Sequence, residues 1–200
     1  MGLTVYGTRT SGNCHKVRMV LDITGRPYAW RETDILKAET RTPEFLRLNP
    51  NGKVPIVVLD DGTTLAESNA ILWYFGEGTA LVPADRLLQA RMLQWMFFEQ
   101  YTHEPSIAVA RFIRRFLKRD DDPRLPGLHT AGERALAVME EHLAREPYFV
   151  AGRLSLADLA LFAYTHKAAD GGFDVGRFPA VEAWLDRCSA EPGVSVMPSP

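Results

Sequence analysis

The stretch Asn49–Ile71 reads NPNGKVPIVVLDDGTTLAESNAI and decides the fold of this chain. It predicts a loop, a strand that starts at Pro55, a hairpin turn at Asp60–Gly62, a second strand, and a helix that starts at Ser68. A proline supplies no N–H to a sheet, so Pro55 fits the first residue of a strand and not its interior. The stretch therefore predicts the edge of a small sheet followed directly by a helix.

The same stretch offers groups that could bind a short extended peptide. A cis bond between Val54 and Pro55 would leave the N–H and C=O of Val54 free to pair with the main chain of a ligand, as in strand addition. Free N–H groups at the helix start near Ser68 attract a carboxylate, and Glu67 could hold an ammonium group. A ligand with a peptide-like middle and an amino-acid head fits these groups. The alternative for Val54-Pro55 is a rigid strand entry without a ligand.

Composition places the chain among ordinary globular proteins and argues against several kinds of partner. Of 200 residues, 46% are hydrophobic and 24% are charged, and the formal net charge is −2, so we expect no nucleic-acid partner. No apolar run approaches the roughly 20 residues that span a bilayer, and the N-terminus lacks a secretory signal pattern. Cys14 and Cys188 are too few for a disulfide framework. We therefore expect a cytoplasmic protein without a membrane partner.

The first 76 residues predict an α/β domain built on a mixed four-stranded sheet. Alternating β-prone residues indicate strands, and apolar residues at helical spacing indicate helices, in the order β-α-β-α-β-β-α. Strands are expected at residues 3–6 and 28–33 and on both sides of the turn at 60–62; helices are expected from 13 to a stop at Gly25, at 43–48 and at 68–75.

The chain after a linker at residues 77–84 predicts helices throughout, so we expect an all-helical domain over residues 85–200. The longest pattern runs from 85 to 119 and contains Pro105, which removes a hydrogen bond and should bend the helix near 102–104. Further helices are expected at residues 128–145, 155–167 and 179–190.

Four features in this order resemble the glutathione transferase family, of the cytosolic bacterial type with a serine in the active-site loop. They are Ser11 after the first strand, Val54-Pro55, Glu67-Ser68, and the late helix start Ser155-Leu156-Ala157-Asp158. The resemblance implies a thioredoxin-like first domain, a helical domain that forms the second-substrate pocket, and a homodimer. It also implies glutathione as co-substrate, no prosthetic group, and attack of the glutathione thiolate on a hydrophobic electrophile.

Two other functions remain open on the same scaffold. One is a glutathione-dependent disulfide reductase or peroxidase, whose second substrate would be a small disulfide or peroxide. The other is a binding module that uses the fold without catalysis. The presence of Ser11, Val54-Pro55 and Glu67-Ser68 argues against the module, because such a protein need not keep a ligand site.

The resemblance also implies how the first domain would hold glutathione. Lys53 would pair with the glycine carboxylate, and Val54, fixed by Pro55, would pair through its backbone with the cysteinyl unit. Glu67 and Ser68 would hold the γ-glutamyl end.

Ser11 is the expected catalytic residue because a hydroxyl beside a helix N-terminus can stabilise a thiolate. Lowering the pKa of a thiol by two units takes about 2.7 kcal/mol, and one hydrogen bond to a charged group contributes roughly 1.5–3 kcal/mol. The amide of Asn13 could share or take over this role, and Thr10 is a third candidate. The structural alternative for Ser11 is a helix cap.

The wall of the second-substrate pocket is expected from the first loop and the helix around Pro105. The candidates are Thr10, Tyr101, Ser106, Ile107 and Arg111. The basic run from Arg111 to Arg119 is either a solvated helix face or, through Arg111 or Arg115, a feature that favours anionic substrates.

The remaining chemical motifs favour structural roles. Cys14 and His15 point about 100° apart on a helix, so we expect Cys14 to be a core residue and not a nucleophile paired with His15. The five histidines show no metal-ligand spacing, so no metal site is expected. Ser155 and Asp158 form the pattern of a capping box that should stabilise the helical domain.

Overall fold

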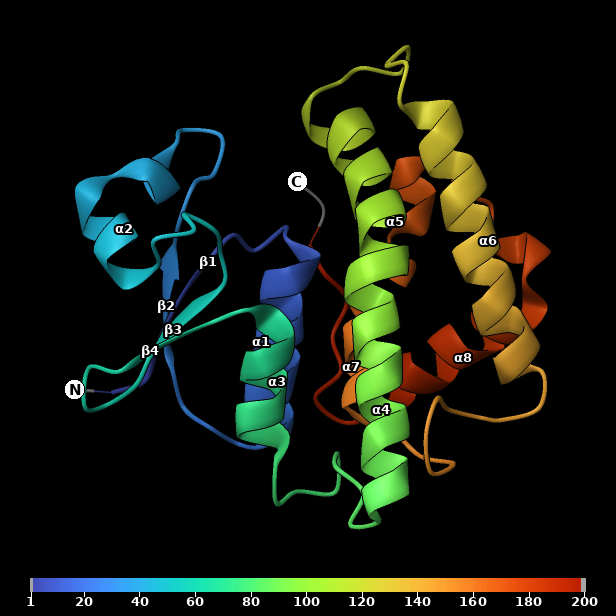
Figure 1. Ribbon diagram of the computed structural model, residues 1–200, viewed down its shortest axis with the longest axis horizontal. Helices are drawn as coiled ribbons and strands as arrows, with labels where there is room; N and C mark the ends of the chain where they lie inside the picture. Colours follow the sequence, from blue (N-terminus) through green and yellow to red (C-terminus); the bar gives the residue numbers. More distant parts are fainter. Residues whose placement is uncertain (1, 199–200) are drawn as a thin grey trace.

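The computed structural model describes residues 2–198 and confirms the mixed four-stranded sheet (Figure 1). The strands lie in the order β2-β1-β3-β4, with bounds β1 Thr4–Gly7, β2 Ala29–Glu32, β3 Ile56–Val58 and β4 Thr64–Ala66. β2 is parallel to β1, whereas β3 is antiparallel to both β1 and β4. The sheet therefore ends in the hairpin that the sequence predicted on both sides of Asp60–Gly62.

Two helices separate the sheet from the second half of the chain, and one short helix lies on the opposite side (Figure 1). α1 (Gly12–Ile23) and α3 (Ser68–Gly76) pack on one another and also contact α7 of the helical part, whereas α2 (Pro43–Leu48) lies beyond the sheet. Thr42 caps α2 through its hydroxyl, which accepts from the N–H of Phe45, as expected for a Thr-Pro helix start. The N-terminal ends of α1 and α3 thereby meet next to the helical part.

The second half of the chain is helical, as expected, and is arranged around α7 (Leu156–Thr165). Every residue of α7 is buried, and α4 (Arg86–Phe98), α5 (Glu104–Arg111) and α8 (Pro179–Ala190) pack on it. α6 (Leu125–Leu143) packs on α5 and α8. α6 begins three residues before the predicted start at 128. Pro126 lies in its first turn, where the missing N–H of a proline leaves no bond unmade.

The long helix expected over residues 85–119 is helical from Arg86 to Phe116 and contains two turns of different winding. π-helical turns at η2 (Glu99–His103) and η3 (Phe112–Phe116) alternate with α4 and α5. η2 ends just before Pro105, which has no N–H for a regular bond to the preceding turn. A π-helical turn absorbs such a defect by taking in an extra residue, and it lies where a bend was predicted, near 102–104.

The capping box at the start of α7 is present and is built around one carboxylate. Asp158 Oδ2 accepts from the backbone N–H and the hydroxyl of Ser155, at 2.9 and 2.6 Å. Its Oδ1 accepts from the N–H of Phe149 and from the indole N–H of Trp184, both at 3.0 Å. Burial raises the pKa of Asp158 to about 6, although these donors favour the carboxylate. The motif thus ties α7 to α8 and to the preceding loop.

A segment near the end of the chain covers α1 and α7. The ring Nε2–H of His15 donates to the carbonyl of Ser195 at 2.6 Å, and the N–H of Met197 donates to Nε2 of His166 at 3.0 Å. The two rings lie 5.6 Å apart, and burial lowers the pKa of each histidine to about 4. Both histidines are therefore neutral at pH 7 and serve as hydrogen-bonding groups.

Within residues 2–198, no helix has the length and apolar content that crossing a bilayer requires.

Candidate active site

A polar cavity of about 210 Å³ lies where the N-terminal ends of α1 and α3 meet the loop before β3. All five residues predicted to hold glutathione line it, and the expected cis bond between Val54 and Pro55 is present. The full set of lining residues is Asn13, Asn49, Lys53, Val54, Pro55, Glu67, Ser68, Gln100 and Glu104. The structure thus brings together, in one cavity, residues from four separate segments of the chain.

Local hydrogen bonds fix the loop that carries Lys53 and Val54. The side-chain amide of Asn49 donates to the carbonyl of Lys53 at 2.9 Å, and its oxygen accepts from the N–H of Asn51 at 3.1 Å. Gly52 has a φ of 63°, a left-handed conformation that glycine adopts without a side-chain clash. The Asn-Gly loop therefore presents Lys53 and Val54 to the cavity in a defined conformation.

Glu67 has an unusual backbone conformation at the edge of the same cavity. Its φ is 66°, which costs a residue with a side chain of order 1–3 kcal/mol and persists where the surroundings impose it. Its carbonyl accepts the first helical bond from Ile71, at 3.0 Å, so α3 begins directly at Ser68. Strain of this kind concentrates at ligand sites, and here it places an acid and a hydroxyl side by side on the cavity wall.

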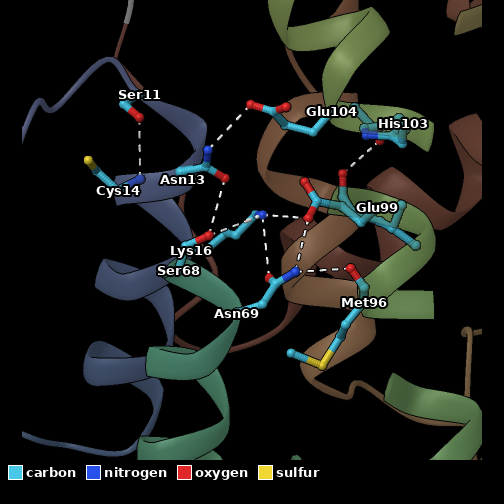
Figure 2. Close-up of polar contacts among 12 residues, drawn as sticks. Ser11, Asn13, Cys14, Lys16, Ser68, Asn69, Met96, Glu99, His103 and Glu104 are labelled. Atoms are coloured by element: carbon cyan, nitrogen blue, oxygen red, sulfur yellow. Dashed lines mark hydrogen bonds and ion pairs between the residues drawn. The ribbon is translucent and has the colours of Figure 1, made fainter. Parts of the chain in front are cut away.

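A buried ion pair lies next to the residues of the polar cavity and hydrogen-bonds to Ser68 (Figure 2). Lys16 Nζ of α1 lies 2.6 Å from Glu99 Oε2 of η2, and both side chains are completely buried. Lys16 also donates to the Ser68 hydroxyl and to the Asn69 oxygen, each at 3.4 Å, while the Asn69 amide donates to Glu99 at 3.2 Å. The network joins α1, α3 and the helical part, so the position of Ser68 depends on all three.

Asn13 is directed into this network and not toward Ser11 (Figure 2). Its oxygen accepts from the Ser68 hydroxyl at 3.2 Å, and its amide donates to Glu104 Oε1 at 3.4 Å. Burial, and next the neighbouring charge of Glu99, raise the pKa of Glu104 above its ordinary range. Asn13 therefore lines the polar cavity, and its amide is already engaged there.

An apolar cavity of about 430 Å³ adjoins the polar one, and Glu104 lines both. Its wall comes from the first loop, the segment after β2, α5 with η3, and α7. The lining residues are Thr8, Thr10, Ser11, Glu32, Asp34, Ile35, Leu36, Glu104, Ala108, Val109, Arg111, Phe112, Phe116 and Tyr164. Volume and lining suit a small molecule with an apolar body.

Ser11 caps α1, as the structural alternative for it expected, and it also faces a cavity. Its hydroxyl accepts from the N–H of Cys14 at 3.4 Å, which makes it the N-cap of α1, and it also lines the apolar cavity. Cys14 itself is buried, and desolvation raises the pKa of its thiol to about 11, so it is not a reactive thiolate. The interpretation of Cys14 as a core residue agrees with this environment.

Three of the five residues predicted for the second-substrate wall lie elsewhere. Tyr101 is 88% exposed, whereas Ser106 and Ile107 are buried, with the Ser106 hydroxyl donating to the carbonyl of His103 at 3.0 Å. For Ser106 and Ile107 the π-helical turn η2 supplies a cause: its extra residue rotates the following helix by about 100° relative to a regular helix. The face of α5 that meets the cavity therefore begins at Glu104, and Thr10 and Arg111 are the predicted residues that do line it.

Arg111 is a buried link between the first loop and the helical part. It is 2% exposed, donates from Nη1 to the carbonyl of Thr10 at 3.0 Å, and pairs with Asp170 at 3.2 Å. Arg114, by contrast, pairs with the exposed Asp120 at 2.8 Å. The basic run is thus not a uniform solvated face: its first member holds the loop that carries Ser11.

Sequence reasoning missed Glu104 and Tyr164 as cavity residues. Glu104 lies next to Pro105, but only the π-helical turn decides which side of the helix it occupies. Tyr164 belongs to a helix of almost continuous apolar character, which shows no periodic signal for a site. In residues 2–198 no group of three or more potential metal ligands comes together.

Comparison with known proteins assigns both halves of the chain to one family. Residues 10–77 match the model of the glutathione S-transferase N-terminal domain, and residues 108–192 match that of the glutathione S-transferase C-terminal domain. The crystal structure of a glutathione S-transferase from Xanthobacter autotrophicus Py2 is similar, with 50% identity, a TM-score of 0.95, and coverage of 98% of this chain and 97% of that one.

Two more distant relatives have names that bear on chemistry. The disulfide-bond oxidoreductase YfcG of Escherichia coli K12 is 27% identical, with 90% of this chain and 87% of that protein covered. The glutathione transferase URE2P6 from Phanerochaete chrysosporium, in complex with oxidized glutathione, is 25% identical with a TM-score of 0.87, covering 96% and 93% of the two chains.

Proposed function

This chain belongs to the glutathione S-transferase family, and we propose that it activates glutathione as a thiolate for attack on an electrophile in the apolar cavity. The observation that carries the proposal is the junction of a polar and an apolar cavity at Glu104, with the N-terminus of α1 beside it. A peptide-like ligand in the polar cavity would have its sulfur at this junction. The reacting atoms of both substrates would then be neighbours, which is a large part of catalysis of this kind.

Glutathione would be held by groups at three points of the polar cavity. Lys53 would pair with the glycine carboxylate and Val54 with the cysteinyl backbone, while Glu67 and Ser68 would hold the γ-glutamyl end. Support comes from the convergence of these residues on one cavity and from the fixed position of Ser68 against Lys16. A glutathione complex of a relative points in the same direction.

Ser11 would be the main donor to the thiolate, since it lines the apolar cavity at the N-terminus of α1. Helix termini add about 0.3–1 kcal/mol of anion stabilisation, and a charge-assisted hydrogen bond adds roughly 1.5–3 kcal/mol. Together they can lower the pKa of a thiol by about two units, so no general base is needed. Asn13 would act indirectly, because its amide is engaged with Glu104 and Ser68.

The second candidate function is reduction of a disulfide or peroxide by glutathione. The relationship to a disulfide-bond oxidoreductase and to a transferase bound to oxidized glutathione favours it. The thiolate would attack one sulfur of a disulfide, and a second glutathione would release oxidized glutathione from the mixed disulfide. The same thiolate site would serve both reactions.

One assay distinguishes these functions. Glutathione is incubated with an aromatic halide, a small disulfide and a hydroperoxide, and both conjugate and oxidized glutathione are measured. A conjugate without oxidized glutathione supports the transferase, and the reverse product pattern supports the reductase. Binding of glutathione with neither product and no thiolate absorbance would contradict both.

Variants of the two candidate donors test the assignment within the site. Ser11→Ala should raise the pKa of bound glutathione and lower turnover at neutral pH more than it weakens binding. Asn13→Ala should change the pKa less. If only Asn13→Ala raises the pKa, Asn13 is the donor and the role of Ser11 is limited to the helix cap.

We also propose that the chain forms a homodimer through α4 and η2. Ala90, Gln94, Phe97 and Tyr101 follow one another at helical spacing and are all exposed, Phe97 by 67%. A second copy of the chain would cover these side chains. Sedimentation velocity of the wild type and of Tyr101→Glu should show a dimer and a monomer, respectively.

The two free cysteines suit a reducing compartment such as the cytoplasm.

A further inference from the structure

The hydroxyl of Tyr164 lies at the wall of the apolar cavity, next to Ser11 and the first turn of α1. Tyr164 belongs to α7, so it reaches the first domain from the centre of the helical part. Gly12 makes this approach possible: a Cβ atom on Gly12 would lie 2.6 Å from the tyrosine ring. The ring therefore sits directly against the backbone of the helix terminus that the proposed thiolate would face.

The hydroxyl end of the ring lies at this terminus. The ring carbon that carries the hydroxyl, Cζ, would be 2.6 Å from a Cβ on Gly12, and Tyr164 and Ser11 line the same cavity. A phenol has one donor hydrogen and can accept two hydrogen bonds. The one hydrogen of Tyr164 can therefore be donated to an acceptor in the cavity, in addition to the hydrogen of the Ser11 hydroxyl.

Electrostatics keep that hydrogen on the tyrosine. Burial, followed by the charge of Glu104, raises the pKa of Tyr164 above its ordinary value, so the phenol is not ionised at any physiological pH. It is thus a permanent donor in a half-enclosed, largely apolar space. Such a donor, already oriented before the ligand arrives, stabilises an anion more than water does.

Resting on the function proposed above, we propose that Tyr164 is a catalytic residue whose phenol O–H donates a hydrogen bond to the sulfur of glutathione. The Ser11 hydroxyl would donate to the same sulfur, so the thiolate would have two hydrogen-bond donors. The proton of the thiol leaves to solvent, and the phenol keeps its own proton. The sulfur lone pair then forms the bond to the electrophile, whose leaving group departs with its electron pair.

The alternative role of Tyr164 is packing alone, since it is only 7% exposed. The two roles differ in one variant. Tyr164→Phe keeps the ring against Gly12 and removes only the hydroxyl. If Tyr164 only packs, the ionisation of bound glutathione is unchanged by this substitution.

The experiment is a pH titration of thiolate absorbance in the complex of glutathione with the wild type and with Tyr164→Phe. Loss of a hydrogen bond to a charged group should raise the pKa of the bound thiol by about one to two units. At a pH below both values, kcat should fall by about 10- to 100-fold. Affinity for S-methylglutathione, which has no thiol to ionise, should stay the same.

A matched control is Tyr148→Phe. The Tyr148 hydroxyl donates to Glu191 at 2.7 Å, and this residue lines neither of the two cavities. It should leave the pKa of the thiol and kcat unchanged. A second replacement of Tyr164 by 3-fluorotyrosine preserves the fold and makes the phenol a stronger donor, so it should lower the pKa of the thiol.

The outcomes separate this inference from the function on which it rests. An unchanged thiol pKa in Tyr164→Phe and with 3-fluorotyrosine overturns the role of Tyr164 while leaving the transferase intact. Absence of thiolate and of any product in the wild type overturns both. A raised pKa in Tyr164→Phe together with an unchanged S-methylglutathione affinity supports the role.

Discussion

The polar and the apolar cavity differ in how their walls are held. Around the polar cavity, side chains are joined to one another: Lys16, Ser68 and Asn13 form a chain of hydrogen bonds that ends at Glu104. The apolar cavity is closed partly by side chains that have little support, such as Leu36, which is 59% exposed. A fixed wall suits a ligand that never changes, and a loosely held wall suits substrates that differ in shape.

The largest expected effect comes from breaking the support of the polar wall. Lys16→Ala leaves Glu99 buried without its cation, so the free energy of unfolding should fall by about 3–5 kcal/mol. Urea denaturation measures this. Arg145→Ala is the control, because its pair with Glu141 is exposed and should contribute less than about 1 kcal/mol. Equal losses in the two variants would contradict the special role of the buried pair.

Acid should lower the free energy of unfolding through a region that lines neither cavity. The pKa of His15 and of His166 is lowered to about 4 in the folded chain, so the unfolded chain binds these protons first as the pH falls. The two neutral histidines contribute their full stabilisation above about pH 6.5. As the pH falls from 6.5 to 4, the free energy of unfolding should decrease by about 3 kcal/mol for each histidine. Denaturation at several pH values tests this.

A variant isolates the contribution of one histidine to this pH dependence. His166→Gln keeps an acceptor for the Met197 N–H but does not titrate. The slope of stability against pH between 6.5 and 4 should be smaller in this variant than in the wild type. An identical slope would assign the acid sensitivity to other groups.

Loss of polar-wall contacts should weaken glutathione without affecting the other substrate. Glu67→Ala and Ser68→Ala should each reduce the affinity for glutathione by about 1–3 kcal/mol, the cost of a lost charge-assisted hydrogen bond. Calorimetric titration measures the affinity, and the KM for the electrophile should change little. Wild-type affinity in both variants would exclude a γ-glutamyl site here.

The smallest effect is expected at the apolar wall. Phe116 packs on Phe112 at a ring distance of 5.5 Å and lines only the apolar cavity. Phe116→Ala should raise the KM for an aromatic electrophile by about fivefold, near 1 kcal/mol, and leave glutathione affinity unchanged. Leu87→Ala, at an exposed site outside both cavities, should change neither. A drop in glutathione affinity in Phe116→Ala would show that the two walls are coupled.

The two cavities also differ in how well their lining residues could be predicted from the sequence. Lys53 to Pro55 and Glu67 to Ser68 are neighbours in the chain, and a strand start and a helix start determine where they point. The apolar wall is assembled from segments up to 156 positions apart, from Thr8 to Tyr164, so no local pattern describes it.

The errors at Ser106 and Ile107 have one physical origin. A regular helix through Pro105 would present a different face to the first loop, and the π-helical turn η2 changes the phase by one residue. Sequence periodicity gives the length of a helix well, but it does not reveal an inserted turn. The mixed four-stranded sheet, the capping box at Ser155 and the core position of Cys14 depended on local rules and could be predicted.

The contact between His15 and Ser195 spans 180 positions of the chain. During synthesis, α1 therefore emerges from the ribosome long before the segment that covers it. A nascent chain that stops short of residue 195 would lack the carbonyl that accepts from His15, a residue that is fully buried in the finished protein. The covering of this face of α1 thus requires translation to reach residue 195, and shorter chains would keep the face exposed.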